Sequence, residues 1–105
     1  MKIAVTSEGK DLSSAVDPRF GRCKYFLIFD TGSENFEAVE NTCAQNSGGA
    51  GIQAGQLMIS KGVEAVLTGH VGPNASQVLT PAGIKIHTGI SGKVSEAVAS
   101  FQNKV

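Results

Sequence analysis

Few side chains in this chain are of the types that bind metals or metal-sulfur clusters. They are two cysteines, Cys23 and Cys43, and two histidines, His70 and His87. Thiolates and imidazoles are the ligands that transition metals and metal-sulfur clusters prefer. Cys23, Cys43 and His70 each border a glycine-rich turn, where exposed backbone N–H groups can contact an anion. These residue types therefore indicate a site for a metal-sulfur or other anionic ligand.

A run of small residues, Gly48-Gly49-Ala50-Gly51, precedes a segment with helical periodicity. Glycines at the start of a helix leave backbone N–H groups open to a ligand, and the positive end of the helix dipole favours an anion. Arg19, Arg22 and Lys24 add positive charge beside Cys23, which would favour its thiolate. We therefore expect Gly48, Gly49, Gly51 and Arg22 to offset the charge of a bound anion.

The elements that must position these residues follow from hydrophobic periodicity. Short apolar runs of strand type are followed by segments in which apolar residues recur at helical spacing. We expect strands at residues 2–6, 25–29, 36–40, 65–68 and 84–88, and helices beginning near residues 51, 73 and 94. Ser91 is the expected N-cap of the last helix, because a serine side chain can accept a hydrogen bond from the first turn.

Connection rules arrange these strands. The short turn at residues 30–33 makes the second and third strands an antiparallel hairpin, whereas helical crossovers make the fourth and fifth strands parallel neighbours. We expect an α/β fold with three layers, α/β/α, ribonuclease H-like, around a five-stranded mixed sheet of order 3-2-1-4-5. Cys23 would then lie beside Cys43, and both histidines would fall at the same edge, where open α/β sheets bind ligands.

Length and composition narrow the class of protein. The chain has 105 residues, 41% of them hydrophobic, so we expect a single domain over residues 1–105. Nine basic and nine acidic side chains give no net charge that would attract nucleic acid or an anionic membrane. No apolar stretch approaches the roughly 20 residues of a membrane span, and no signal-peptide pattern opens the chain. We expect a cytoplasmic protein whose cysteines are thiols or ligands.

Three runs of residues carry a resemblance to a known family. They are residues 17–22 (Asp-Pro-Arg-Phe-Gly-Arg), 48–54 (Gly-Gly-Ala-Gly-Ile-Gln-Ala) and 68–75 (Thr-Gly-His-Val-Gly-Pro-Asn-Ala). In sequence and spacing the chain resembles, over essentially its whole length, the dinitrogenase iron-molybdenum cofactor biosynthesis family. That family includes nitrogenase-cofactor carriers, the C-terminal domain of the radical enzyme that assembles the cofactor core, and the molybdenum-copper orange proteins.

The resemblance implies a protein that holds or ferries a metal-sulfur cluster without catalysing a reaction. The cargo would be of the iron-molybdenum, iron-sulfur or molybdenum-copper type, and the partners would be proteins that assemble or accept it. By matching position, the resemblance implies that His70 contacts the cluster. The ligand roles of Cys43 and Cys23 rest instead on the strand geometry expected for this chain.

Other functions use parts of the same pattern. Cys23, Cys43 and His70 are also the donor types of a simple zinc site, although they lack the close Cys-x-x-Cys spacing typical of one. A phosphate or nucleotide sensor would use the turn at residues 48–51. A nuclease with a ribonuclease H-like sheet needs carboxylates on the central strands, and residues 2–6 and 65–68 contain none, so we expect no nuclease activity.

Each candidate residue also has a plain structural interpretation. Cys23 could be a small core residue, since free cysteines are among the most buried side chains. The turn at residues 48–51 could be only a tight turn, Arg22 could pair with Asp17, and His87 could be a solvated strand end.

Overall fold

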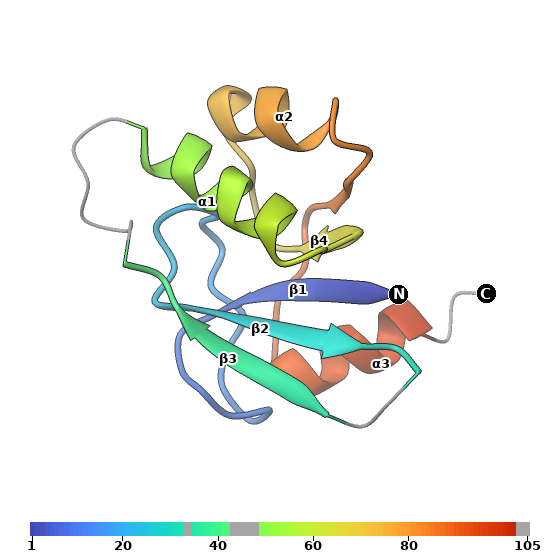
Figure 1. The fold of residues 1–105 in the computed structure, drawn as a ribbon. Helices are drawn as coiled ribbons and strands as arrows, with labels where there is room; N and C mark the ends of the chain where they lie inside the picture. Colours follow the sequence, from blue (N-terminus) through green and yellow to red (C-terminus); the bar gives the residue numbers. More distant parts are fainter. Residues whose placement is uncertain (33–34, 43–48, 103–105) are drawn as a thin grey trace.

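The strands of the protein form one mixed sheet in a computed structural model that describes residues 1–32, 35–42 and 49–102 (Figure 1). The strands are β1 (Lys2–Ser7), β2 (Tyr25–Asp30), β3 (Phe36–Glu40), β4 (Ala65–Leu67) and β5 (Lys85–His87). Their order in the five-stranded sheet is β3-β2-β1-β4-β5. β1 pairs antiparallel with β2 and parallel with β4, β2 pairs antiparallel with β3, and β4 pairs parallel with β5. The predicted order and directions are confirmed.

Helices cover both faces of this sheet. α1 (Ala50–Ser60) and α2 (Pro73–Leu79) lie on one face, and α3 (Val94–Gln102) lies on the other, as Figure 1 shows. The predicted three-layer arrangement is therefore present. Among the described residues, none of the helices has the length and apolar character needed to cross a bilayer.

Alternation along the strands divides the apolar residues between two cores, because successive side chains of a strand point to opposite faces. In β1, Ala4 joins the core under α1 and α2, whereas Ile3 and Val5 join the core under α3. β2 is buried on both faces from Phe26 to Phe29, which explains its uninterrupted apolar run. β3 is the exposed edge strand, which explains why it carries glutamates.

The start of α3 differs from the prediction. Lys93, not Ser91, directly precedes the helix, and the Glu96 carboxylate accepts a hydrogen bond from the Lys93 backbone N–H at 3.1 Å. This contact is one half of a capping box, in which a glutamate in the first turn reaches back to the N-cap residue. The prediction of Ser91 as N-cap is wrong because a glutamate three residues after the N-cap can satisfy the helix start from the other side.

Candidate functional site

Three loops meet at one end of the sheet and enclose a cavity of about 270 Å³, which we call the glycine cavity. One loop precedes β2, one leads into α1, and one leads from β4 into α2. The residues that line it are Phe20, Gly21, Arg22, Gly49, Ala50, Gly51, Gly72, Pro73, Asn74 and Ala75. Four of these are glycines, so much of the wall is backbone.

Close backbone contact explains why two of these positions are glycine. A Cβ atom on Gly21 would lie 3.1 Å from the Cα of Gly51, and Gly21 has a φ of 92°, which disfavours other residues. A Cβ atom on Gly51 would in turn lie 3.3 Å from the Cβ of Ala75. Side chains at these glycines would push the three loops apart and alter the shape of the cavity.

Buried hydroxyl groups hold the bases of these loops together. The Thr6 Oγ1 lies 2.6 Å from the carbonyl oxygen of Asp17 and 2.7 Å from the Thr68 Oγ1. Because a hydroxyl has one proton, Thr6 donates to the carbonyl and accepts from Thr68. Farther out, the Phe20 backbone N–H donates to the carbonyl of His70 at 3.1 Å. These bonds fix the loop before β2 against the loop after β4.

The electrostatic character of the glycine cavity is positive. Gly49 is the N-cap of α1, with no side-chain cap and no acidic residue in the first turn of the helix. The first N–H groups of an α-helix have no partner within the helix, and they lie at the positive end of its dipole. Arg22 is the one charged side chain among the described residues that line the cavity. An anion is therefore the kind of ligand that this wall favours.

Cys23 does not face the cavity. Its side chain is fully buried in the core under α1 and α2, and its thiol is free. Asn41 holds this segment, since its Nδ2 donates to the carbonyl oxygens of Gly21 at 3.0 Å and Cys23 at 2.9 Å. Burial, followed by the nearby charge of Asp17, raises the pKa of the Cys23 thiol to about 12. The expected thiolate is therefore wrong, and Cys23 is a core residue.

The buried thiol makes the stability of the protein sensitive to alkali. The pKa of Cys23 rises from 9.0 to about 12 on folding, so only the unfolded chain ionises as the pH passes 9.0. The protonated thiol therefore contributes fully to the free energy of unfolding below pH 9.0, and this contribution is lost as the pH rises toward about 12. Above pH 9.0, the native chain should therefore lose about 1.4 kcal/mol of unfolding free energy per pH unit relative to a Cys23→Ala variant. Urea unfolding from pH 8 to about pH 10.5 under reducing conditions measures this, and parallel pH profiles would contradict it.

The remaining predicted residues lie in different places. His70 is exposed in the loop after β4, next to the glycine cavity but outside its wall. His87 lies on the opposite face of the sheet, where its ring packs edge-on against Phe101 of α3 at 5.3 Å. Cys43 and Gly48 lie outside the described residues. The structure thus brings together Arg22, Gly49 and Gly51, places His70 nearby, and separates His87.

Several lining residues were not assigned to the site from the sequence. Phe20, Gly21, Pro73 and Asn74 all line the glycine cavity. They lie within the two runs, 17–22 and 68–75, that carry the family resemblance. Their position in these runs was the signal that could have assigned them to the site. Their side chains gave no such signal, because they are not typical metal ligands.

A family profile and a related protein match nearly the whole chain. The profile of the dinitrogenase iron-molybdenum cofactor family matches residues 1–104. An uncharacterised protein of Methanocaldococcus jannaschii is 31% identical over 104 residues, which span 96% of this chain and 85% of that protein.

Two solved structures are also similar. The apo form of the orange protein from Desulfovibrio gigas has a TM-score of 0.93 at 42% identity, covering 97% of this chain and 87% of that one. A putative NifB protein from Thermotoga, solved by NMR and assigned to the DUF35 family, has a TM-score of 0.85 at 45% identity, covering 98% and 88%. The runs of residues that form the glycine cavity lie within the match over residues 1–104, and the chain belongs to the dinitrogenase iron-molybdenum cofactor family.

Proposed function

We propose that this protein is a small carrier or scaffold that binds an anionic metal-sulfur cluster for assembly or transfer and catalyses no reaction. The observation that carries the proposal is the glycine cavity, in which backbone from three loops and the Arg22 side chain surround one compact space. Its volume of about 270 Å³ is at the small end of ligand pockets, which suits a compact inorganic anion better than an organic cofactor. Family membership supports the same class of cargo.

The donors in this wall suit the outer atoms of a cluster. Backbone N–H groups at the start of α1 and the Arg22 guanidinium can donate hydrogen bonds to sulfide or oxo groups. Among the described residues, no group of three or more His, Cys, Asp or Glu side chains could hold a metal ion. We propose as candidate metal ligands His70, which lies next to the cavity, and Cys43, which is outside the described residues. A site with so few ligands from the protein would release its cargo readily to an acceptor, and the partners would be proteins that assemble or accept the cluster.

The structure argues against a zinc site but leaves a phosphate site as an alternative. A zinc site built from Cys23, Cys43 and His70 loses Cys23, whose buried thiol stays protonated at neutral pH. Phosphate is a more serious competitor, because backbone N–H groups and an arginine bind it as well as they bind a thiometallate. The test must therefore include phosphate and zinc.

Anaerobic reconstitution tests the proposal. The protein is incubated separately with tetrathiomolybdate plus copper, with iron and sulfide, with zinc, and with inorganic phosphate, and is then desalted. We expect metal and sulfide to stay with the protein in at least one of the first two mixtures, with a new absorption band in the visible range. Retention of zinc or phosphate alone, with no coloured species, would contradict a cluster carrier.

Replacing His70 by alanine should weaken cluster uptake while leaving the fold intact. The imidazole is exposed, so its removal costs little packing, whereas loss of a group that supports a metal site typically lowers affinity by about tenfold or more. Titration of the cluster into both proteins, followed in the visible band, measures the change. The control is His87→Leu, which removes the other histidine on the far face of the sheet. Equal uptake by native and His70→Ala protein would remove His70 from the site.

A further inference from the structure

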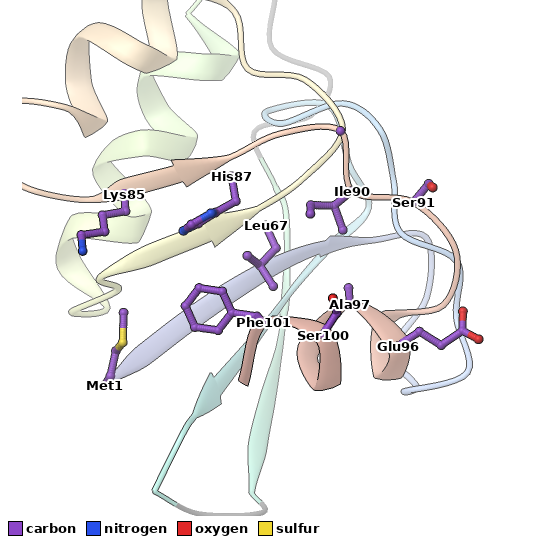
Figure 2. Close-up of a pocket in the computed structure, with 11 residues that line it drawn as sticks. Met1, Leu67, Lys85, His87, Ile90, Ser91, Glu96, Ala97, Ser100 and Phe101 are labelled. Atoms are coloured by element: carbon purple, nitrogen blue, oxygen red, sulfur yellow. The ribbon is translucent and has the colours of Figure 1, made fainter. Parts of the chain in front are cut away.

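A second and larger cavity lies on the opposite face of the sheet, between β4, β5 and α3 (Figure 2). Its volume is about 870 Å³, and we call it the α3 cavity. Its walls include Leu67, Ile90, Ala97 and Phe101, which are apolar, together with Lys85 and His87. The two cavities share no lining residue. The α3 cavity is therefore separate from the site proposed for the cluster.

The register of β5 explains why this space is open. Lys85 pairs with Ala65 of β4, and His87 pairs with Leu67. Ala65 and Leu67 belong to the core under α3, so Lys85 and His87 face the same side. α3 packs its buried residues against that core. On the same face, the outer strand β5 carries a lysine and a histidine in place of apolar side chains. A cavity with two basic groups results.

His87 is in an unfavourable environment within this cavity. Its Nε2 atom is buried and has no hydrogen-bond partner among the described residues. One side of the ring is covered by Phe101, whose centroid lies 5.3 Å away at an interplanar angle of 79° (Figure 2). A buried nitrogen without a partner destabilises the folded state. A ligand that brings a hydrogen-bonding group to this nitrogen would remove that penalty.

The charges around the cavity indicate the sign of the ligand. Lys85 is exposed beside His87 and makes no ion pair within the described part of the chain. Glu96 also lines the cavity, but its carboxylate lies at the opposite end from Lys85 (Figure 2), where it accepts the backbone N–H of Lys93. The amino group of Met1 lies 3.8 Å from the Asp30 carboxylate. Lys85 is thus the charge available to a ligand close to His87, and it favours an anion.

We propose that the α3 cavity binds a small aromatic carboxylate. Its ring would lie among Leu67, Ile90 and Phe101, and its carboxylate would face Lys85 and the Nε2 atom of His87. The volume is within the range of small-molecule sites, and the combination of apolar walls with a few convergent polar groups is typical of them. Nothing in this assignment depends on the metal-sulfur cargo.

Benzoate is a suitable probe. NMR can follow its binding, because His87 reports on the α3 cavity and His70 serves as an internal control. We expect benzoate to bind with a Kd on the order of 1 mM, as a fragment of this size does. Long-range proton–nitrogen spectra should show saturable shifts of the His87 ring nitrogens, while those of the exposed His70 stay unchanged. Benzyl alcohol, which has the same ring without the charge, should bind at least about fivefold more weakly.

Two variants separate the proposal from nonspecific binding. Lys85→Gln should weaken benzoate binding by about fivefold or more, whereas Lys93→Gln, which removes a lysine that does not line the cavity, should not. His87→Leu should abolish the benzoate effect and raise the melting temperature, because the unpaired buried nitrogen is gone. Equal binding of benzyl alcohol and benzoate, unchanged affinity in Lys85→Gln, or unmoved His87 signals at saturating benzoate would each overturn the proposal.

Discussion

Replacing Gly69 by alanine is expected to lower the free energy of unfolding by about 2–3 kcal/mol, the upper part of the range for overpacked sites. A Cβ atom at this position would lie 2.6 Å from the Cα of Pro18 and 2.8 Å from its carbonyl oxygen. Both are backbone atoms, so no side-chain rotation relieves the clash. The loops carrying Pro18 and Gly69 would have to separate, and the wall of the glycine cavity would change with them. Urea unfolding followed by circular dichroism measures the loss.

Gly72→Ala is the matched control for this prediction. Gly72 lies three residues away in the same loop, has an ordinary φ of −72°, and would place a Cβ atom in open space. Gly72 is the N-cap of α2, where alanine is less favourable than glycine, so we expect the unfolding free energy of Gly72→Ala to fall by no more than about 1 kcal/mol, clearly less than for Gly69→Ala. Equal stability of the two variants would show that the contact between the loops at Pro18 and Gly69 is not as close as described.

Reversing the charge of Arg22 is expected to weaken cluster uptake by about a hundredfold. Arg22 is exposed, but its guanidinium lines the glycine cavity and would lie directly against a bound anion. Unit charges about 4 Å apart attract by about 1 kcal/mol even in bulk water, so about 1.4 kcal/mol is reasonable for a cluster with more than one negative charge. Arg22→Glu removes that attraction and adds a repulsion of similar size, about 2.8 kcal/mol in total, which corresponds to a hundredfold. Titration of a pre-formed thiometallate, with the visible band as readout, measures the affinity.

The control for charge reversal is Lys24→Glu. Lys24 is exposed two residues away and does not line the cavity, but its substitution changes the net charge equally. We expect Lys24→Glu to weaken uptake by less than about threefold, because an exposed charge outside the site is screened by solvent and salt. If both variants lost affinity equally, the cargo would respond to the overall field and not to the glycine cavity.

Most of the fold could be predicted because two simple rules act independently. Periodicity separates the strand 25–29 from the helix that follows residue 50, and connection lengths decide which neighbours are parallel. The boundaries were less accurate: β5 is Lys85–His87, shorter at both ends than residues 84–88, and α3 is capped by Glu96 instead of Ser91. Those details depend on which polar groups meet in space, which the pattern of apolar residues does not encode.

The site was predicted only partly, because the direction of a side chain depends on packing that the topology does not determine. The topology correctly brings Cys23 to the ligand edge of the sheet, yet a strand register fixes only where a backbone lies. Whether the thiol turns outward depends on Phe20, Phe26 and Met58, which form a core around it. The local cations suggested a thiolate, but burial outweighs them, since desolvation acts on the thiol directly while the exposed cations are screened by water. The interpretation of Cys23 as a small core residue agrees with the structure.

A wall made largely of main chain has a consequence for experiments on this site. Alanine scanning cannot test the amide donors of residues 49–51, because Ala50 is already alanine and alanine at Gly49 or Gly51 adds a Cβ atom while leaving the amide in place. Exchange of single amides for esters by semisynthesis would remove those donors without adding bulk. The loops would then be revealed as the principal recognition element, and selectivity among cargoes would be tuned by loop shape more than by ligand replacement.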